Sequence, residues 1–202
     1  MPESIVSGAN HPLISTENDT GAILIPLPLV AGPFAIAAAI LVVSGTAKLA
    51  RPDQTVDALR AATLPASKPA VATIAVGELA AGLSALVIGG PWPAIAVLGL
   101  YLGFLAFILI SRTRGADVGG CGCLGARSDT PPGAIHVTFN LIAALAAAIA
   151  IIAAVPDITT IVTDDALDGM AYIAFVGLGT WLSVVLLTDL PRLNSIVERG
   201  MG

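Results

Sequence analysis

The chain has 202 residues, of which 56% are hydrophobic and only 11% charged, and its mean hydropathy is +0.91. Soluble domains carry charge on roughly a quarter of their residues, so this composition excludes an ordinary water-soluble fold. The formal net charge is −5, and we expect the lipid bilayer, not nucleic acid, to be the partner of this surface.

Five segments are long and apolar enough to cross a bilayer. A helix that rises about 1.5 Å per residue needs roughly 20 mostly apolar residues to span a hydrocarbon core of about 30 Å. The five windows run from Leu29 to Leu49, Ala70 to Ile88, Pro93 to Ile110, Ala134 to Val155 and Met170 to Thr188. The sequence therefore predicts an all-α fold, a polytopic membrane helix bundle with a four-helix core at 29–155 and a fifth transmembrane helix at 170–189.

Residues 1–28 precede the first span and are predicted to form an arm outside the cytoplasm. The first twenty residues contain Glu3, Glu17 and Asp19 but neither Lys nor Arg. A secretory signal peptide begins with a basic region, which is missing here. We therefore expect the first apolar segment to stay in the mature protein.

A short amphipathic segment follows the first span. In residues 52–62, Val56 and Leu59 fall on one helical face and most of the charged residues fall on others. This pattern favours a short helix that lies in the membrane interface, and the alternative is an ordinary polar loop.

The second and third spans are expected to form a hairpin, because the segment 89–93 combines two glycines with two prolines. Small residues recur in the third and fourth spans. Gly99 and Gly103 have the G-x-x-x-G spacing, and six alanines lie between positions 143 and 150. Such residues let helix backbones approach closely, and we interpret them as packing surfaces inside the bundle rather than as a dimer interface.

All nine Lys and Arg residues fall on one side of the bilayer if the five spans alternate in direction. They are Lys48, Arg51, Arg60, Lys68, Arg112, Arg114, Arg127, Arg192 and Arg199. The opposite side receives the N-terminal arm, the Gly-Pro turn and the acidic loop 156–169, which has four Asp residues and no base. Basic loops stay in the cytoplasm. We therefore predict a multi-pass protein of the inner or plasma membrane, with its N-terminus outside and its third loop and tail, 190–202, in the cytoplasm.

The loop before the fourth span carries both cysteines of the chain, Cys121 and Cys123, among several glycines. Accessible paired thiols suit thiol–disulfide exchange, and a strained Cys-Gly-Cys disulfide would be readily reduced. The basic residues on either side favour the thiolate. Two alternatives remain open. One is a metal site with an added ligand such as His136, although two thiolates are too few for a closed zinc site, and the other is a glycine turn with incidental cysteines.

Glu78 is the one carboxylate well inside a predicted span. A charge buried in lipid is costly unless a partner offsets it. Lys48, near the end of the first span, faces the same side, and its long stem can reach inward. We therefore expect a Lys48–Glu78 pair, which is either a structural clamp or a functional proton or partner site.

Four stretches resemble the MauE-type methylamine-utilisation membrane proteins and the related DoxX-like group. They are Ser44-Gly45-Thr46-Ala47-Lys48-Leu49, Leu64-Pro65, Gly77-Glu78-Leu79-Ala80-Ala81-Gly82 and Cys121-Gly122-Cys123-Leu124-Gly125. The resemblance covers residues 32–155, and its specific part is the Cys-Gly-Cys loop between the third and fourth spans. It implies a four-helix membrane core that supports disulfide formation or electron delivery during the maturation of exported proteins, alongside a thioredoxin-like partner.

By this resemblance, Cys121 and Cys123 are the catalytic redox pair, and Lys48 and Glu78 are the buried polar signature. We therefore predict thiol–disulfide oxidoreductase-like chemistry that acts on a protein partner, with no organic cofactor and no metal. The alternative is a noncatalytic accessory subunit that packs against a larger membrane complex, such as a respiratory assembly, through its small-residue faces and its fifth helix.

Overall fold

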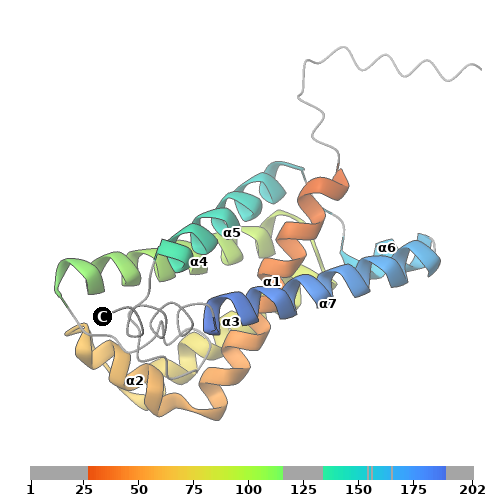
Figure 1. Ribbon diagram of the computed structural model, residues 1–202. Helices are drawn as coiled ribbons and strands as arrows, with labels where there is room; N and C mark the ends of the chain where they lie inside the picture. Colours follow the sequence, from red (N-terminus) through yellow and green to blue (C-terminus); the bar gives the residue numbers. More distant parts are fainter. Residues whose placement is uncertain (1–26, 116–133, 154, 156, 165, 190–202) are drawn as a thin grey trace, which may run out of the picture.

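The computed structural model describes residues 27–115, 134–153, 155, 157–164 and 166–189. Within them every regular element is a helix, in the order α1 (Leu27–Ala50), α2 (Pro52–Ala61), α3 (Lys68–Val87), α4 (Pro91–Thr113), α5 (Ala134–Ala153), α6 (Ile158–Asp164) and α7 (Ala166–Thr188) (Figure 1). Five of these helices, α1, α3, α4, α5 and α7, are long and apolar enough to cross a membrane. The predicted all-α membrane bundle is thus confirmed.

Local sequence explains where several helices begin. Proline stands in the first turn of α2, α3 and α4, as Pro52, Pro69 and Pro91, where its fixed φ suits a helix and its missing N–H removes no hydrogen bond. The Ser67 side chain caps α3, because it accepts a hydrogen bond from the amide of Ala70 at 3.3 Å. The presence of α2 confirms the helical interpretation of its amphipathic segment and excludes the polar loop.

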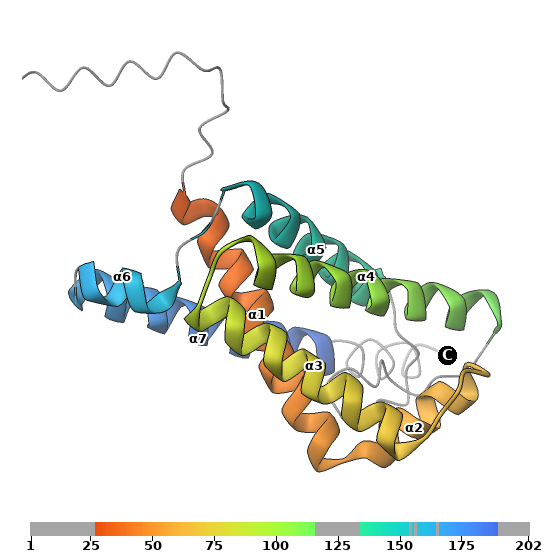
Figure 2. The ribbon, with the colours of Figure 1, turned by 180° about the vertical axis from the view of Figure 1, so that it is seen from behind.

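The central helix of the bundle is α1. It packs most extensively against α3 and also contacts α2, α4, α5 and α7. Helices α4 and α5 lie side by side as a second closely packed pair (Figure 1, Figure 2). The core between the helices is mainly alanine, with a few larger side chains that include Phe34, Leu41 and Tyr101. Small side chains bring the backbones together, and van der Waals packing then holds the helices in lipid.

Two glycines permit the close contact between α1 and α3. A Cβ atom added to Gly45 would lie 2.7 Å from the carbonyl oxygen of Ala75, and one added to Gly82 would lie 2.6 Å from that of Ala38. Both distances are far below van der Waals contact, and the obstructing atoms belong to the backbone. Only glycine therefore allows the two helices to approach this closely.

The interpretation of Gly99 and Gly103 as a packing surface inside the bundle is wrong. Both are exposed on α4, and no described atom of another element lies within 4 Å of a Cβ added at either position. The physical reason is the rotation of α4, which turns the face carrying Val97 and Tyr101 toward the core. The alanines of α5 do pack inward, since five of the six between positions 143 and 150 are buried.

Hydrogen bonds identify the two ends of the bundle. At one end, Nη1 of Arg114 donates to the carbonyl oxygen of Ala62 and to the hydroxyl of Thr63, both at 2.7 Å. At the other end, the amide of Gly90 donates to the carbonyl oxygen of Val155 at 3.4 Å. The described basic residues all belong to α2 or to the helix ends beside it: Lys48, Arg51, Arg60, Lys68, Arg112 and Arg114. One end of the described bundle is therefore basic.

The described residues of the acidic segment predicted as a loop form α6 and the start of α7. The carboxylate of Asp157 accepts hydrogen bonds from the hydroxyls of Thr159 and Thr160 and from the Thr160 amide, the last at 3.3 Å. The side-chain bonds from Thr159 and Thr160 stabilise the charged form and lower the pKa of Asp157 to about 2. Asp157 thus acts as the N-terminal cap of α6.

Candidate functional site

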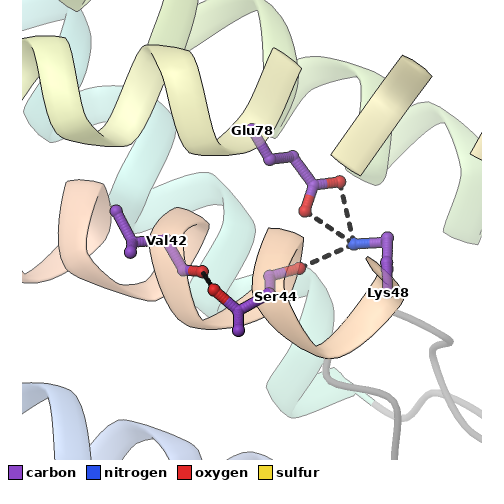
Figure 3. A network of polar contacts seen from close by, with 5 residues as sticks. Val42, Ser44, Lys48 and Glu78 are labelled. Carbon is purple, nitrogen blue, oxygen red and sulfur yellow. Dashed lines mark hydrogen bonds and ion pairs between the residues drawn. The ribbon is translucent and has the colours of Figure 1, made fainter. Parts of the chain in front are cut away.

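A charged pair lies inside the bundle between α1 and α3. The ammonium nitrogen of Lys48 is 2.8 Å from each carboxylate oxygen of Glu78, and its contact with Oε2 is a hydrogen bond (Figure 3). The same nitrogen donates to the hydroxyl of Ser44 at 2.6 Å. Glu78 is 0% exposed and Lys48 only 3%. The arrangement is therefore a buried, hydrogen-bonded ion pair.

The local sequence of each helix places these groups opposite one another. Ser44 and Lys48 are four residues apart in α1, so they lie on the same helical face, one turn apart. Gly45 belongs to the same turn of α1, and Gly82 follows Glu78 by one turn of α3. Because the two glycines bring the helix backbones together at this level, the lysine and glutamate side chains can meet across the interface.

Helix α4 supplies an aromatic wall beside the ion pair. The Lys48 nitrogen lies 5.1 Å from the centroid of the Phe104 ring, which is within range of a cation–π interaction. The Phe104 ring meets the Tyr101 ring edge to face, with the centroids 6.0 Å apart. The Tyr101 hydroxyl donates to the carbonyl oxygen of Ala37 at 2.8 Å, which ties α4 to α1. The pair is thus held by three helices.

The arrangement offers two kinds of chemistry. A lone charge in the interior of a membrane bundle is costly, whereas an ion pair with an added hydroxyl ligand offsets much of that cost. The pair can therefore hold α1 against α3. It can also exchange a proton, because the nitrogen of Lys48 and the carboxylate of Glu78 are within hydrogen-bond distance.

Three polar groups of the bundle were not singled out from the sequence as structural contacts. Ser44 completes the ion pair, Tyr101 bonds to α1, and the hydroxyl of Tyr172 in α7 donates to the carbonyl oxygen of Ala31 at 2.9 Å. The signals were present. Ser44 is one helical turn from Lys48, and a tyrosine within an apolar span needs a partner for its hydroxyl.

Cys121 and Cys123, the predicted redox pair, lie outside the residues that the structure describes. His136, the alternative metal ligand, is buried in α5 near the backbone of Leu187 at the end of α7. Nδ1 of His136 has no hydrogen-bond partner among the described groups. In the same part of the chain, no cluster of three or more His, Cys, Asp or Glu side chains could hold a metal ion.

The basic residues beside the third loop have separate environments. Arg112 is close enough to His136 to interact with it electrostatically. The guanidinium of Arg114 instead holds the C-terminal end of α2 through Ala62 and Thr63. Arg127 lies outside the described ranges.

A known protein family matches most of this chain. The family described as methylamine utilisation protein MauE matches residues 26–153, which include the helices α1 to α5. No curated protein and no solved structure matches the chain. The match covers more than half of the sequence, and it ends before α6 and α7. The protein with the buried Lys48–Glu78 pair therefore belongs to the MauE family of multi-pass membrane proteins.

Proposed function

We propose that this MauE-family protein exchanges electrons with a thioredoxin-like protein through a Cys121–Cys123 dithiol–disulfide pair. One observation carries the proposal. Both cysteines of the chain stand in a single Cys-Gly-Cys triplet between the third and fourth spans, inside the segment that matches the family. Two thiols so close in the chain can close a reducible disulfide, which suits exchange rather than a structural cross-link.

The helix ends that flank the loop support this role. Arg112 at the end of α4 interacts with His136 at the start of α5, so both ends lie at the basic end of the bundle. Arg114 bonds to the end of α2 at the same place. Because both helix ends lie at the same end of the bundle, we expect the loop between them at one membrane face, where a peripheral protein can approach it. The positive charge there favours thiolate over thiol.

The exchange has two steps. The thiolate of one cysteine attacks a sulfur of the partner's disulfide, which forms a mixed disulfide and releases the other partner sulfur as a thiolate. The second cysteine then attacks the mixed disulfide, so the Cys121–Cys123 disulfide forms and the partner leaves with two thiols after taking up protons. Two electrons pass to the partner, and the reverse sequence returns them.

Trapping the mixed disulfide tests the proposal. Purified full-length protein in nanodiscs would be mixed with an oxidised thioredoxin-like protein, and covalent adducts would be resolved by non-reducing electrophoresis. We expect Cys121→Ser or Cys123→Ser to accumulate an adduct that dithiothreitol removes when each sample is quenched with N-ethylmaleimide, because the forward attack is blocked and the partner thiolate released in the first step is alkylated before it can reverse that step. The wild-type chain should instead form its internal disulfide and release the reduced partner.

A matched control places one exposed thiol at the other end of the bundle. The variant Cys121→Ser/Cys123→Ser/Thr163→Cys has a single cysteine on α6, where Thr163 is exposed. It should trap no more partner than the cysteine-free chain does. Equal trapping by this control and by the single serine variants would show that the Cys-Gly-Cys loop has no special role.

The outer face of α7 favours a second candidate, a noncatalytic accessory subunit of a larger membrane complex. This helix lies beyond the family match, and large apolar side chains such as Met170, Phe175 and Trp181 are exposed on it. If the chain is an accessory subunit, it should migrate as part of a larger assembly on native gels after mild solubilisation of the membrane. An assembly that persists in the cysteine-free chain, with unchanged thiol status of every component, would favour this candidate over exchange.

A further inference from the structure

A cavity of about 270 Å³ lies between α2, α3 and α4 beside the buried ion pair. Its wall includes Lys48, Thr55, Ile74, Gly103, Phe104 and Phe107. Figure 2 shows the three helices on the same side of the molecule. The cavity is open on one side, and its lining is almost entirely apolar. An apolar cavity of about 150 Å³ can already hold a benzene ring, so this cavity has room for a larger apolar group.

The open side of the cavity faces the part of the surface that lipid covers. Ile74 and the glycines Gly99 and Gly103 are exposed, and they belong to the candidate spans α3 and α4. No described atom of another element lies within 4 Å of a Cβ placed on either glycine, so the wall of α4 is hollowed there. A group that enters the cavity therefore comes from the hydrocarbon core of the bilayer.

Basic side chains outnumber acidic side chains near the cavity. Among the described acids around α2, Asp53 pairs with Lys68 at 2.8 Å and Asp57 pairs with Arg60 at 3.6 Å. Glu78 pairs with Lys48 in the cavity wall.

These pairs leave Arg51 as an exposed cation that forms no ion pair with a described residue. It connects α1 to α2, three residues after Lys48 and four before Thr55, both of which line the cavity. Arg51 therefore places a positive charge in the same short stretch of chain as two residues of the cavity wall.

We propose that this site binds an anionic phospholipid, with one acyl chain in the cavity and the phosphate beside Arg51. The apolar wall and the lateral opening suit an acyl chain. Arg51, which forms no ion pair with a described residue, favours a negatively charged headgroup. The proposal is independent of thiol exchange, since it rests only on described residues of α1 to α4 and of the link between α1 and α2.

Native mass spectrometry of the full-length protein tests the proposal. The protein would be mixed in detergent with equal amounts of phosphatidylglycerol and phosphatidylcholine whose acyl chains are identical. It would then be released from the detergent in the mass spectrometer. We expect single phosphatidylglycerol adducts to exceed phosphatidylcholine adducts by about fivefold, which is the effect of one interfacial arginine. Arg51→Gln should abolish the preference, and Arg51→Lys should preserve it.

The role of the cavity is tested by filling it. Gly103→Leu should reduce adducts of both lipids, because its side chain occupies the space of the acyl chain. Gly77→Leu is the matched control, since Gly77 is also exposed with open space around it but lies on α3 and does not line the cavity. It should bind lipid as the wild type does.

Three outcomes would overturn the proposal. Equal amounts of the two lipid adducts on the wild-type chain would show that the site does not select for negative charge. Identical lipid binding by Gly103→Leu and Gly77→Leu would rule out the cavity as the binding site of the acyl chain. A wild-type dimer that Gly103→Leu alone dissociates, with adducts unchanged, would show that a second copy of the chain covers this face.

Discussion

Lys48 and Glu78 place two full charges in the interior of an apolar bundle. Either charge alone would be strongly unfavourable there, and only their contact, with the Ser44 hydroxyl as a third group, makes the arrangement stable. The cost of breaking such a pair comes mainly from the charge that is left behind. The effects of single and double substitutions should therefore differ sharply.

Single substitutions of the pair should destabilise the protein more than the double substitution. We expect Glu78→Leu or Lys48→Met alone to lower the free energy of unfolding by about 3–5 kcal/mol, because each leaves one buried charge without a partner. The double variant Lys48→Met/Glu78→Leu should recover most of this loss. Unfolding in mixed detergent micelles measures the three values, and a loss in the double variant equal to the sum of the single losses would contradict the prediction.

Asp157 provides a pH-dependent contact at the opposite end of the bundle. Its pKa is lowered from 3.8 to about 2 by the hydroxyls of Thr159 and Thr160. A carboxyl whose pKa is depressed by folding stabilises the folded form above its unfolded pKa, and this contribution disappears as the pH falls through the folded value. The cap of α6 should therefore weaken between about pH 4 and pH 2.

Amide hydrogen exchange of α6, corrected for the intrinsic rate at each pH, measures this effect. Protection should fall below about pH 4 in the wild type. Asp157→Asn keeps an acceptor at the cap but cannot titrate, so its protection should not change over this range. Asp157→Ala should show low protection throughout. Identical pH profiles for the wild type and Asp157→Asn would rule out the carboxylate as the cause.

At the scale of the elements, the contact between α1 and α3 determines where the ion pair can form. Gly45 and Gly82 meet backbone carbonyl oxygens across this interface, and a backbone atom cannot rotate away as a long side chain can. A methyl group at either position therefore separates the helices. Such a separation would also lengthen the contact between Lys48 and Glu78.

Alanine substitution distinguishes this interface from the rest of α3. Gly82→Ala should lower the free energy of unfolding by about 1–3 kcal/mol, since it overpacks the contact with Ala38. Gly77→Ala, in the same helix but surrounded by open space, should leave stability unchanged or raise it by up to about 1 kcal/mol. Thermal unfolding of the two variants provides the comparison, and equal destabilisation would mean that the close approach is unimportant.

For the whole molecule, the separation of charge between the two ends predicts how the bundle is oriented in the membrane. The described basic residues gather around α2, whereas Asp157 and Asp168 belong to the segments at the other end. Basic segments are retained in the cytoplasm. We therefore expect α2 and the Cys-Gly-Cys loop on the cytoplasmic side and α6 outside.

Labelling with a membrane-impermeant maleimide tests this orientation in intact cells. In a cysteine-free background, Thr163→Cys on α6 should react from outside, and Arg60→Cys on α2 should react only after permeabilisation. Arg60 and Thr163 are both exposed, so the protein itself should shield neither position from the maleimide. Cys121 and Cys123 of the wild type should behave as Arg60→Cys does. The reverse pattern would place the Cys-Gly-Cys loop outside.

Helix packing was only partly predictable from the residues. The Ser67 and Asp157 caps are local signals, yet the acidic composition of segment 156–169 predicts a loop where the short helix α6 forms. The packing role of the α5 alanines was interpreted correctly, but that of Gly99 and Gly103 was not. Small residues permit close packing without requiring it, so their presence alone does not identify a contact.

The sequence by itself determined the number and length of the spans and the distribution of charge between their ends, because these follow from the order of apolar and charged residues along the chain. Only the tertiary structure decided which face of each span is buried. A helix that is apolar on every side has no polar face to fix its rotation in lipid. The central place of α1, its approach to α3 through Gly45 and Gly82, and the outward turn of Gly99 and Gly103 therefore depend on how the helices pack together.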